Sequence, residues 1–268
     1  ENLSNSLNMP IIIKNGSMEG NEYSKSSNVE NKLRHIRYKL ISDEIIDKKI
    51  NGLLTAHHLN DHAETFLMKI SRGAGLDGME GISPYIKQQE FNNIEIYRPL
   101  LEIPKKSLYK LCLEMNVFPR EDKTNISNKF SRNRIRNNII PEFEKINTNF
   151  LDSIKRVTDL IVSTNNYHKE DTINTLSTIN FMEDKFGLCF NRELFNSLNN
   201  FNKKFILNFM VKSKWNINIL ENKHLNYIIE KSKSSKRNFS LDLPRPLILT
   251  ATNSTLFIKD LNHINNLE

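Results

Sequence analysis

The stretch LLTAHHLNDHAETFLMKI, Leu53–Ile70, decides the fold. Its first residues form a short apolar run, which predicts a β-strand that ends at Thr55. The following segment predicts an amphipathic helix, because apolar residues recur every three or four positions: Leu59, Ala63, Phe66, Leu67 and Ile70. A strand, an abrupt turn and a helix are typical of an α/β sheet, in which sites lie at the carboxyl ends of the strands. His57 and His58 fall at that point.

The polar residues of this junction allow three interpretations. His58, Asp61 and His62 share one helical face, and the two histidines have the spacing of helical zinc ligands. A zincin would need Glu directly after the first His, where this chain has Leu59. A capped helix start with solvated side chains is the second interpretation. The third is a phosphate and base site, in which Asp61 holds Mg²⁺ or positions a substrate amine and the imidazoles donate hydrogen bonds.

A glycine cluster follows the predicted helix, in the segment RGAGLDGMEGI, Arg72–Ile82. Such clustering indicates a loop that turns tightly or approaches a ligand. Arg72 at the end of the helix, together with free backbone N–H groups, can bind an anion. The segment is neither a P-loop nor a Rossmann fingerprint, because no Gly-Lys-Ser/Thr follows and no strand precedes it.

A second charged region contains REDKTN, Arg120–Asn125, and RNRIRNNIIPEF, Arg132–Phe143. It is either a solvated charge run or a site where Arg, Asp and Asn recognise phosphate or a base edge. Between Pro119 and Pro141 few residues are apolar, which predicts a surface connection into a second region.

The rest of the chain predicts two domains, as its 268 residues allow. Pro10–Ile13 and Ile94–Tyr97 read as strands, and helices are expected from Val29 and after Pro104. Residues 150–233 have helical periods almost throughout, and the tail after residue 239 alternates as a β element does. We therefore predict an α/β domain with a parallel sheet over residues 1–141 and a mostly helical domain with a small C-terminal β element over residues 142–268.

Composition narrows the class of protein. Lys and Arg number 38 against 31 acidic residues, a net charge of +7, which favours nucleic acid over a membrane surface unless it reflects general bias. Cys112 and Cys189 provide no disulfide framework and no CxxC pair, so we expect a reducing, cytoplasmic compartment. No apolar run is long enough to predict a membrane span. The chain opens with Glu1 and not Met, so we expect a fragment.

Several motifs in a fixed order resemble bacterial tRNA(Ile)-lysidine synthases, which belong to the N-type ATP pyrophosphatase or PP-loop group. They are TAHHLNDHAET, RGAGLDGMEGI, YRPLLEIPK (Tyr97–Lys105), REDKTN and RNRIRNNIIPEF. NKLRHIRYKLI, Asn31–Ile41, resembles an upstream Arg-x-x-Arg-Tyr helix of that family. The similarity is densest over residues 31–150.

The resemblance implies an ATP-dependent ligase that converts the wobble cytidine of tRNA(Ile) with a CAU anticodon to lysidine. ATP activates C2 of the base by adenylation with release of pyrophosphate, and the ε-amine of lysine then displaces AMP. The implied cofactors are ATP and Mg²⁺, and the implied partners are that tRNA, lysine, a separately supplied N-terminal half and a second copy in a homodimer.

Roles for individual residues also follow from the resemblance. Asp61 and Arg132 are expected to be catalytic, with Asp61 linked to the metal. The residues expected to bind ATP or phosphate are His57, His58, Arg72, Arg134 and Arg37. Those expected to order the substrate loop are Glu121, Asp122 and Asn125.

The sequence departs from the family pattern in three places. Asn60 stands where the family often has Asp, and His62 where it often has Gln. The nucleotide loop Ser-Gly-Gly-x-Asp-Ser occurs nowhere in the chain, so we expect the parallel sheet to be incomplete and the chain alone to be inactive. The alternatives are a catalytically dead tRNA-binding remnant, a related PP-loop tRNA thiolase, which commonly uses paired cysteines, and a zinc hydrolase.

Overall fold

The computed structural model describes residues 2–16, 29–88, 91–120, 131–215, 220–234, 238–244 and 246–261. The chain divides into two compact units, Glu1–Ile161 and Val162–Glu268. The division falls inside the helix α7, Phe150–Thr178, whereas the sequence analysis placed a domain boundary at residue 141.

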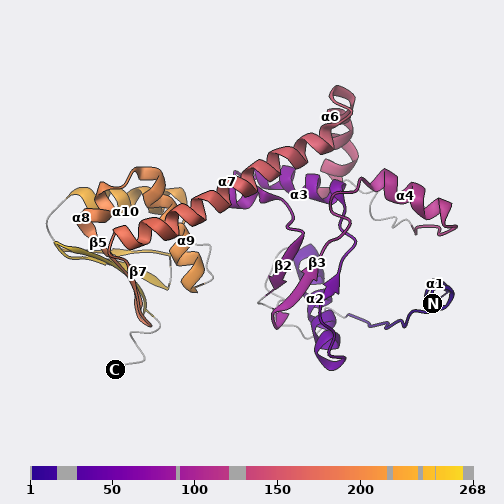
Figure 1. Ribbon diagram of the computed structural model, residues 1–268, viewed down its shortest axis with the longest axis horizontal. Coiled ribbons are helices and arrows are strands. Elements are labelled where there is room, and N and C mark those ends of the chain that lie inside the picture. The colour runs from indigo at the N-terminus through magenta and orange to yellow at the C-terminus, as the bar shows by residue number, and fades with distance from the viewer. Residues whose placement is uncertain are drawn as a thin grey trace. The chain divides into compact units, whose positions relative to one another are not determined.

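The first unit combines helices with a small sheet (Figure 1). Its strands are β1 (Leu53–Leu54), β2 (Tyr85–Gln88) and β3 (Ile94–Tyr97). Its α-helices are α1 (Asn2–Ser6), α2 (Val29–Asp47), α3 (Leu59–Ser71), α4 (Lys105–Glu114), α5 (Ser131–Arg134), α6 (Ile140–Ile146) and the first part of α7. A 3₁₀ helix spans Leu76–Glu80, and a π-helical segment spans Ile135–Ile139.

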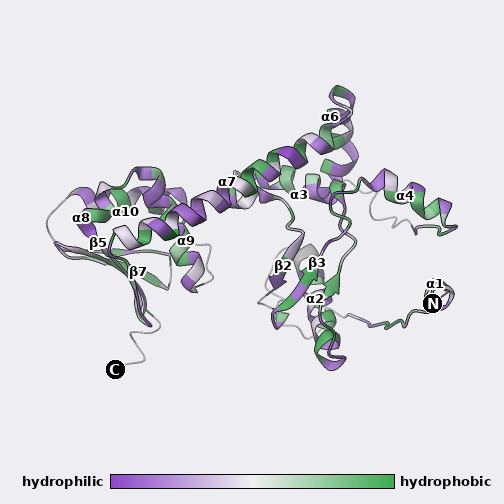
Figure 2. Cartoon of the chain, viewed as in Figure 1, coloured by the Kyte–Doolittle hydropathy of each residue, from purple (hydrophilic) through white to green (hydrophobic). Residues whose placement is uncertain are grey.

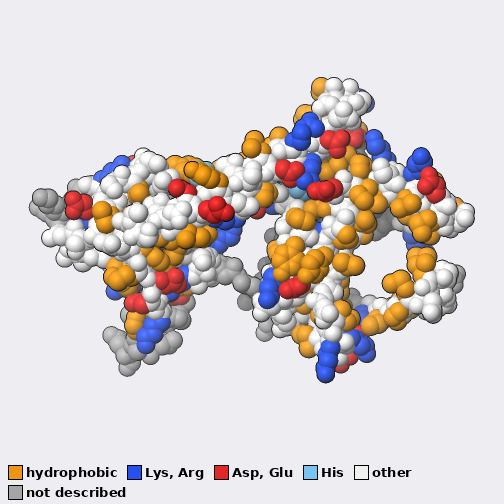
Figure 3. Space-filling model, viewed as in Figure 1, with side chains coloured by type: hydrophobic (Ala, Val, Ile, Leu, Met, Phe, Trp, Pro, Cys, Tyr) orange, Lys and Arg blue, Asp and Glu red, His pale blue; other side chains and the backbone are white. Residues whose placement is uncertain are grey.

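The sheet has the order β1-β3-β2, with β1 parallel and β2 antiparallel to β3. This arrangement confirms the predicted α/β class, although β2 was not predicted and makes the sheet mixed. One face packs on α2 through Tyr38, Ile94 and Ile96. The other face carries the row Leu54, Tyr97 and Tyr85, which are 71%, 40% and 44% exposed. Figure 3 shows hydrophobic side chains gathered over β2 and β3.

A second core in this unit joins α3 to the helices after residue 131. Leu59, Ala63 and Phe66 of α3 pack with Ile135 and Ile140, and with Leu151 and Ile154 of α7. Positions five apart, such as 135 and 140, point about 140° apart in a regular α-helix. Here the N–H of Ile140 donates to the carbonyl of Ile135, a π-helical bond, and both side chains are buried. The π turn therefore brings both isoleucines to the same core.

Two local expectations were wrong. Pro10–Ile13 is not a strand: residues 9–16 form neither helix nor strand, and Ile11, Ile12 and Ile13 are at least half exposed. Residues 131–141 are not a surface connection but helical, with Ile135 and Ile140 in the core. The π turn hides their periodicity, because five-residue spacing matches no α-helical stripe.

The second unit packs helices against an antiparallel sheet. The helices are the second part of α7, α8 (Arg192–Ser197), α9 (Asn200–Trp215) and α10 (Asn222–Ser234). The strands are β4 (Met182–Glu183), β5 (Gly187–Asn191), β6 (Phe239–Asp242), β7 (Leu247–Ala251) and β8 (Thr255–Asp260), in the order β4-β5-β8-β7-β6.

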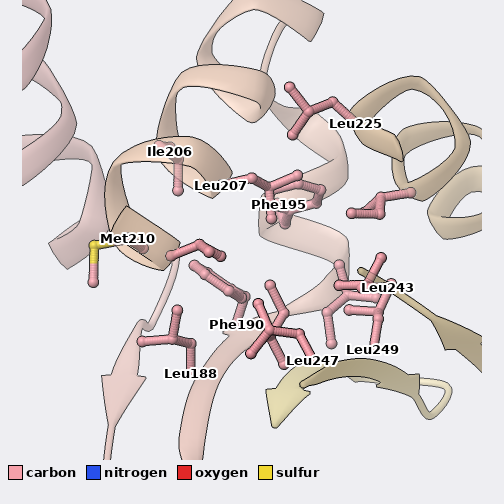
Figure 4. Packing of buried hydrophobic residues seen from close by; sticks show 14 of the residues in the cluster. Leu188, Phe190, Phe195, Ile206, Leu207, Met210, Leu225, Leu243, Leu247 and Leu249 are labelled. Carbon is pink, nitrogen blue, oxygen red and sulfur yellow. The ribbon is translucent and has the colours of Figure 1, made fainter. Parts of the chain in front are cut away.

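The predicted β tail is confirmed by β6, β7 and β8, but the helical interpretation of residues 150–233 is wrong at β4 and β5. The sheet is larger than expected because β5 pairs with β8 far along the chain, a non-local pairing that local periods do not reveal. The core joins Phe190 and Phe195 to leucines of the sheet and to α9 (Figure 4).

No helix in the described part of the chain is both long and apolar enough to cross a membrane. Even α7, with 29 residues, mixes hydrophilic and hydrophobic residues along its length (Figure 2).

Candidate active site

Polar side chains gather where the parallel strands β1 and β3 end. The N–H of Thr55 donates to the carbonyl of Tyr97 (3.0 Å), which extends the pairing one residue beyond β1. The hydroxyl of Thr55 lies 2.8 Å from Nδ1 of His57 and fixes that ring. Arg98 directly follows β3. The chain thus places candidate residues at the strand ends, as expected for an α/β sheet.

A capping box starts α3. The N–H of Asp61 donates to Nδ1 of His58 (3.3 Å), and the N–H of His58 donates to Oδ2 of Asp61 (3.1 Å). Nδ1 of His58 also lies 3.2 Å from Oδ2 of Asp61. The neighbouring Asn60 accepts a hydrogen bond from the N–H of Lys105 (2.9 Å) and so anchors the start of α4.

Four side chains form what we call the carboxylate–arginine cluster: Asp61, Glu64, Arg132 and Arg136. Glu64 is fully buried and accepts Nε of Arg132 (2.7 Å) at one oxygen and Nε of Arg136 (2.6 Å) at the other. Oδ1 of Asp61 lies 3.1 Å from Nη2 of Arg132 and 3.5 Å from Nη2 of Arg136. The cluster therefore ties α3 to the helical segment after residue 131.

The electrostatics of this cluster favour the charged form of Arg136. The hydrogen bond to Glu64 raises the pKa of Arg136 above its ordinary value, against the opposing effect of burial. A buried carboxylate with two guanidinium partners is compensated, whereas either charge without the other would be strongly destabilising.

Three arginines contact Tyr38, and we call Arg34, Arg37 and Arg98 with Tyr38 the tyrosine–arginine cluster. The guanidinium carbons of Arg34 and Arg37 lie 5.1 and 5.8 Å from the centre of the Tyr38 ring. Arg98 donates through Nη1 to the carbonyl of Ser83 (2.6 Å) and hydrogen-bonds Tyr38. Burial lowers the pKa of Arg98 below its ordinary value.

Charged residues of both clusters affect the pKa of His57. Burial lowers its pKa; Asp61 opposes that shift, and the charges of Arg98, Arg132 and Arg34 add to it. His57 is therefore neutral at pH 7 and can donate or accept one hydrogen bond through the ring nitrogen that does not contact Thr55.

His62 contacts the end of the glycine-rich loop at Gly81 and Ile82. Its Nε2 lies 2.9 Å from the hydroxyl of Thr158, whose own hydrogen is donated to the carbonyl of Lys155 (2.8 Å). Nδ1 of His62 lies 3.2 Å from both the N–H and the carbonyl oxygen of Ile82. Gly81 lies against the ring with φ of 75°, and a Cβ there would be 2.3 Å from Cε1 of His62.

The structure brings some of the predicted site residues together and leaves others apart. His57, His58, Asp61 and Arg132 meet at the start of α3. Arg72 is exposed at the end of α3, Arg134 is exposed on α5, and Arg37 lies beside Tyr38. Glu121, Asp122 and Asn125 lie outside the described residues.

Sequence reasoning missed Glu64, Arg136 and Arg98 as site residues. Glu64 stands three positions after Asp61, and Arg136 four after Arg132, so helical spacing could have found both. Arg98 carried no local signal beyond its place after a predicted strand.

The described residues do not fit a Mg²⁺ site by themselves. One carboxylate oxygen of Asp61 accepts a backbone N–H and the other faces two arginines. No group of three His, Cys, Asp or Glu side chains within the described ranges lies close enough to hold a metal ion. The arginines supply the fixed positive charge at this place.

Comparisons with known proteins agree with the arrangement of motifs. The family model of the PP-loop domain matches residues 1–143. The chain is similar to a tRNA(Ile)-lysidine synthase of Clostridioides difficile, with 29% identity over 97% of this chain and 54% of the relative. One from Enterococcus faecalis is 38% identical over 48% of this chain and 28% of the relative. The resemblance predicted from the motifs is thereby confirmed.

A solved structure is also similar, the U34-tRNA thiolase NcsA of Methanococcus maripaludis. The TM-score is 0.40 at 20% identity, over 53% of this chain and 47% of the thiolase chain. The chain spans about half the length of the Clostridioides difficile relative, and a smaller share of the Enterococcus faecalis one.

Proposed function

The chain belongs to the PP-loop family, and from that membership we propose that it forms part of an ATP-dependent tRNA(Ile)-lysidine synthase. In this proposal ATP adenylates the wobble cytidine of tRNA(Ile) with a CAU anticodon, and lysine then replaces AMP. The similarity to relatives of that name over nearly the whole chain supports it. We propose the cytoplasm as the place of the reaction, where this tRNA, ATP and lysine occur together.

The observation that carries the proposal is the carboxylate–arginine cluster at the strand ends. Arg132 and Arg136 are held by carboxylates before any substrate binds, so their guanidinium groups are preorganised. Adenylation develops negative charge on the α-phosphate and on the departing pyrophosphate. Fixed cations aimed at such charge lower the barrier without reorganisation.

The second step needs a group that receives a lysine amine. The ε-amine attacks C2, AMP leaves with the bonding electron pair and the former base oxygen, and the amine loses a proton. Asp61 is the suitable carboxylate, because its side chain is 15% exposed whereas that of Glu64 is inaccessible. We therefore assign Asp61 to orient the amine and Glu64 to hold the arginines.

Two further parts of the proposal concern partners. The loop that binds the ATP phosphates in this family, Ser-Gly-Gly-x-Asp-Ser, does not occur in these 268 residues, and we propose that a segment carrying it is supplied to the chain during the reaction. The second unit carries Lys and Arg side chains that would make tRNA binding depend on salt. A homodimer is a further expectation.

A lysine-ligation assay tests the proposal. Labelled lysine, Mg-ATP and unmodified tRNA(Ile) are incubated with the chain alone, and with the chain plus the N-terminal segment of the Clostridioides difficile relative. Incorporation in the second mixture that is lost with Asp61→Ala supports the proposal. Incorporation that survives Asp61→Ala removes Asp61 from catalysis. If neither mixture incorporates lysine but the chain still binds tRNA, the result favours the alternative of a catalytically dead tRNA-binding remnant.

A further inference from the structure

We propose that Arg98, with Arg34 beside it, forms an oxyanion-binding site at the carboxyl end of β3, which takes a phosphate or carboxylate group of a substrate. The observation behind this proposal is a buried cation that the described protein leaves without an acidic partner.

Arg98 is held rigidly and is only partly satisfied. Its N–H donates to the carbonyl of Pro84 (2.9 Å), its carbonyl accepts the N–H of Leu101 (3.3 Å), and Nη1 donates to Ser83. The residue is 7% exposed, and its Nε is buried without a hydrogen-bond partner. An unsatisfied N–H on a buried guanidinium is destabilising, so a fold that keeps one calls for an explanation.

The charges around Arg98 do not compensate it. Asp61 and Glu64, the carboxylates of the neighbouring cluster, are already engaged by Arg132 and Arg136. Within the described ranges, neither Arg98 nor Arg34 has a carboxylate within salt-bridge distance; the phenol of Tyr38 contacts both. Burying a cation without a counter-charge is costly, and a bound anion would remove that cost.

The position is one where ligands bind in this class of fold. Arg98 follows β3 as His57 follows the parallel strand β1, and the carboxyl ends of parallel strands open onto a common crevice. The charges of Arg98, Arg34 and Arg132 all lower the pKa of His57, so the three guanidiniums lie within electrostatic range of one imidazole. An anion held by Arg98 would therefore lie at the same end of the parallel strands as His57.

The chemistry of the guanidinium fixes the class of ligand. Its planar fork of N–H donors matches a group with two or more oxygens on one centre, which phosphates and carboxylates share. The choice of source rests on the proposed function: the phosphates of ATP and pyrophosphate, or the α-carboxylate of lysine.

Isothermal titration calorimetry of the whole chain, together with the added PP-loop segment, separates these sources. The probes are inorganic pyrophosphate, L-lysine and cadaverine, which has the amines of lysine without the carboxylate. Arg98→Met is compared with Arg156→Met, which removes an exposed arginine of α7 outside the site. We expect at least tenfold weaker binding of one oxyanion probe to Arg98→Met, and unchanged binding to Arg156→Met.

The pattern of loss identifies the ligand. Loss of pyrophosphate binding alone assigns the site to phosphate. Loss of L-lysine binding, with cadaverine bound equally weakly by the parent and variant chains, assigns it to the carboxylate. The proposal is overturned if Arg98→Met binds pyrophosphate and L-lysine as tightly as the parent chain does. It is also overturned if the parent chain binds neither of these oxyanions.

Two additions keep the test decisive. Arg34→Met removes the exposed partner without endangering the core, and it should weaken the same probe as Arg98→Met does. If it has no effect and Arg98→Met melts far below the parent chain, Arg98 is structural and the proposal fails. These readouts do not depend on ligation, so a parent chain that binds an oxyanion through Arg98 but ligates no lysine contradicts only the proposed function.

Discussion

Arg136 donates hydrogen bonds to both carboxylate oxygens of Glu64, with Nε 2.6 Å from Oε1 and Nη2 2.9 Å from Oε2. This forked pair joins α3 to the π-helical segment, and Arg132 shares the same carboxylate. Since Glu64 is inaccessible to solvent, the pair governs the stability of the first unit as well as the geometry of the site.

Glu64→Gln keeps the shape of the side chain but removes the charge that two guanidiniums share. We expect the free energy of unfolding to fall by about 3 kcal/mol, the lower end for a broken buried pair, because the arginine side chains are 24% and 27% exposed. Urea denaturation measures it. Glu114→Gln, at a 60% exposed carboxylate, is the matched control and should change stability by less than about 0.5 kcal/mol. Equal effects of the two variants would contradict the structural role of Glu64.

Arg136→Lys tests whether Glu64 needs the two parallel N–H donors of a guanidinium or only a positive charge. A lysine ammonium cannot place two parallel donors on one carboxylate, so we expect a loss of about 1–3 kcal/mol in the free energy of unfolding. Arg134→Lys makes the same change at an exposed position two residues away and should be nearly neutral. Parallel urea titrations compare them, and a greater loss from Arg134→Lys would place the wrong arginine at Glu64.

Acidification should destabilise the first unit through His62. Burial lowers the pKa of His62 below its ordinary value, so the unfolded chain binds this proton more readily than the folded chain does. The folded state is therefore unaffected above about pH 6.5 and loses stability as the pH falls below that value. Unfolding free energies at pH 7.5, 6.5 and 5.5 should decline less steeply in His62→Gln. His224→Gln, in the second unit, is the matched substitution, and a parent-like slope in His62→Gln would contradict the assignment.

Gly81→Ala and Gly75→Ala form a matched pair in the glycine-rich loop. At residue 81 a methyl group would strain a positive φ and collide with His62, so we expect a loss of about 1–3 kcal/mol or more. At residue 75 φ is −73° and no atom lies within 4 Å of the added carbon, so alanine should be neutral or stabilising by up to about 1 kcal/mol. Thermal melting of both variants provides the measurement. Similar melting temperatures would mean that the loop is not clasped by His62.

Local sequence patterns predicted those elements whose periodicity is visible within a few consecutive residues. The strand at residue 53, the helix over Leu59–Ile70 and the strand Ile94–Tyr97 depend on short-range periodicity, and the structure confirms all three. The strand expected at Pro10–Ile13 failed because an apolar run forms a strand only beside a pairing partner, and the structure gives it none among the described residues.

The grouping of the candidate site could be predicted only where its residues are close in sequence. His57, His58 and Asp61 were expected together because they follow one strand and start one helix. Arg136 was passed over in favour of Arg134, since alternation along the sequence does not reveal which arginines share a helical face. Arg98 depends on a relationship between two strands and a helix that no local pattern contains.

The π turn at Ile135–Ile139 has a consequence for how this segment tolerates insertions and deletions. Of the arginines that hold Glu64, Arg132 precedes the turn and Arg136 lies in its first half, whereas Ile140 follows the turn and lies in the core. Removing one residue would convert the turn to regular α-helix and rotate one side by about 100° relative to the other. Either the guanidiniums or the isoleucine would then face the wrong way. The segment is therefore fixed in length to the single residue, so an alignment gap here would mark a protein whose site is built differently.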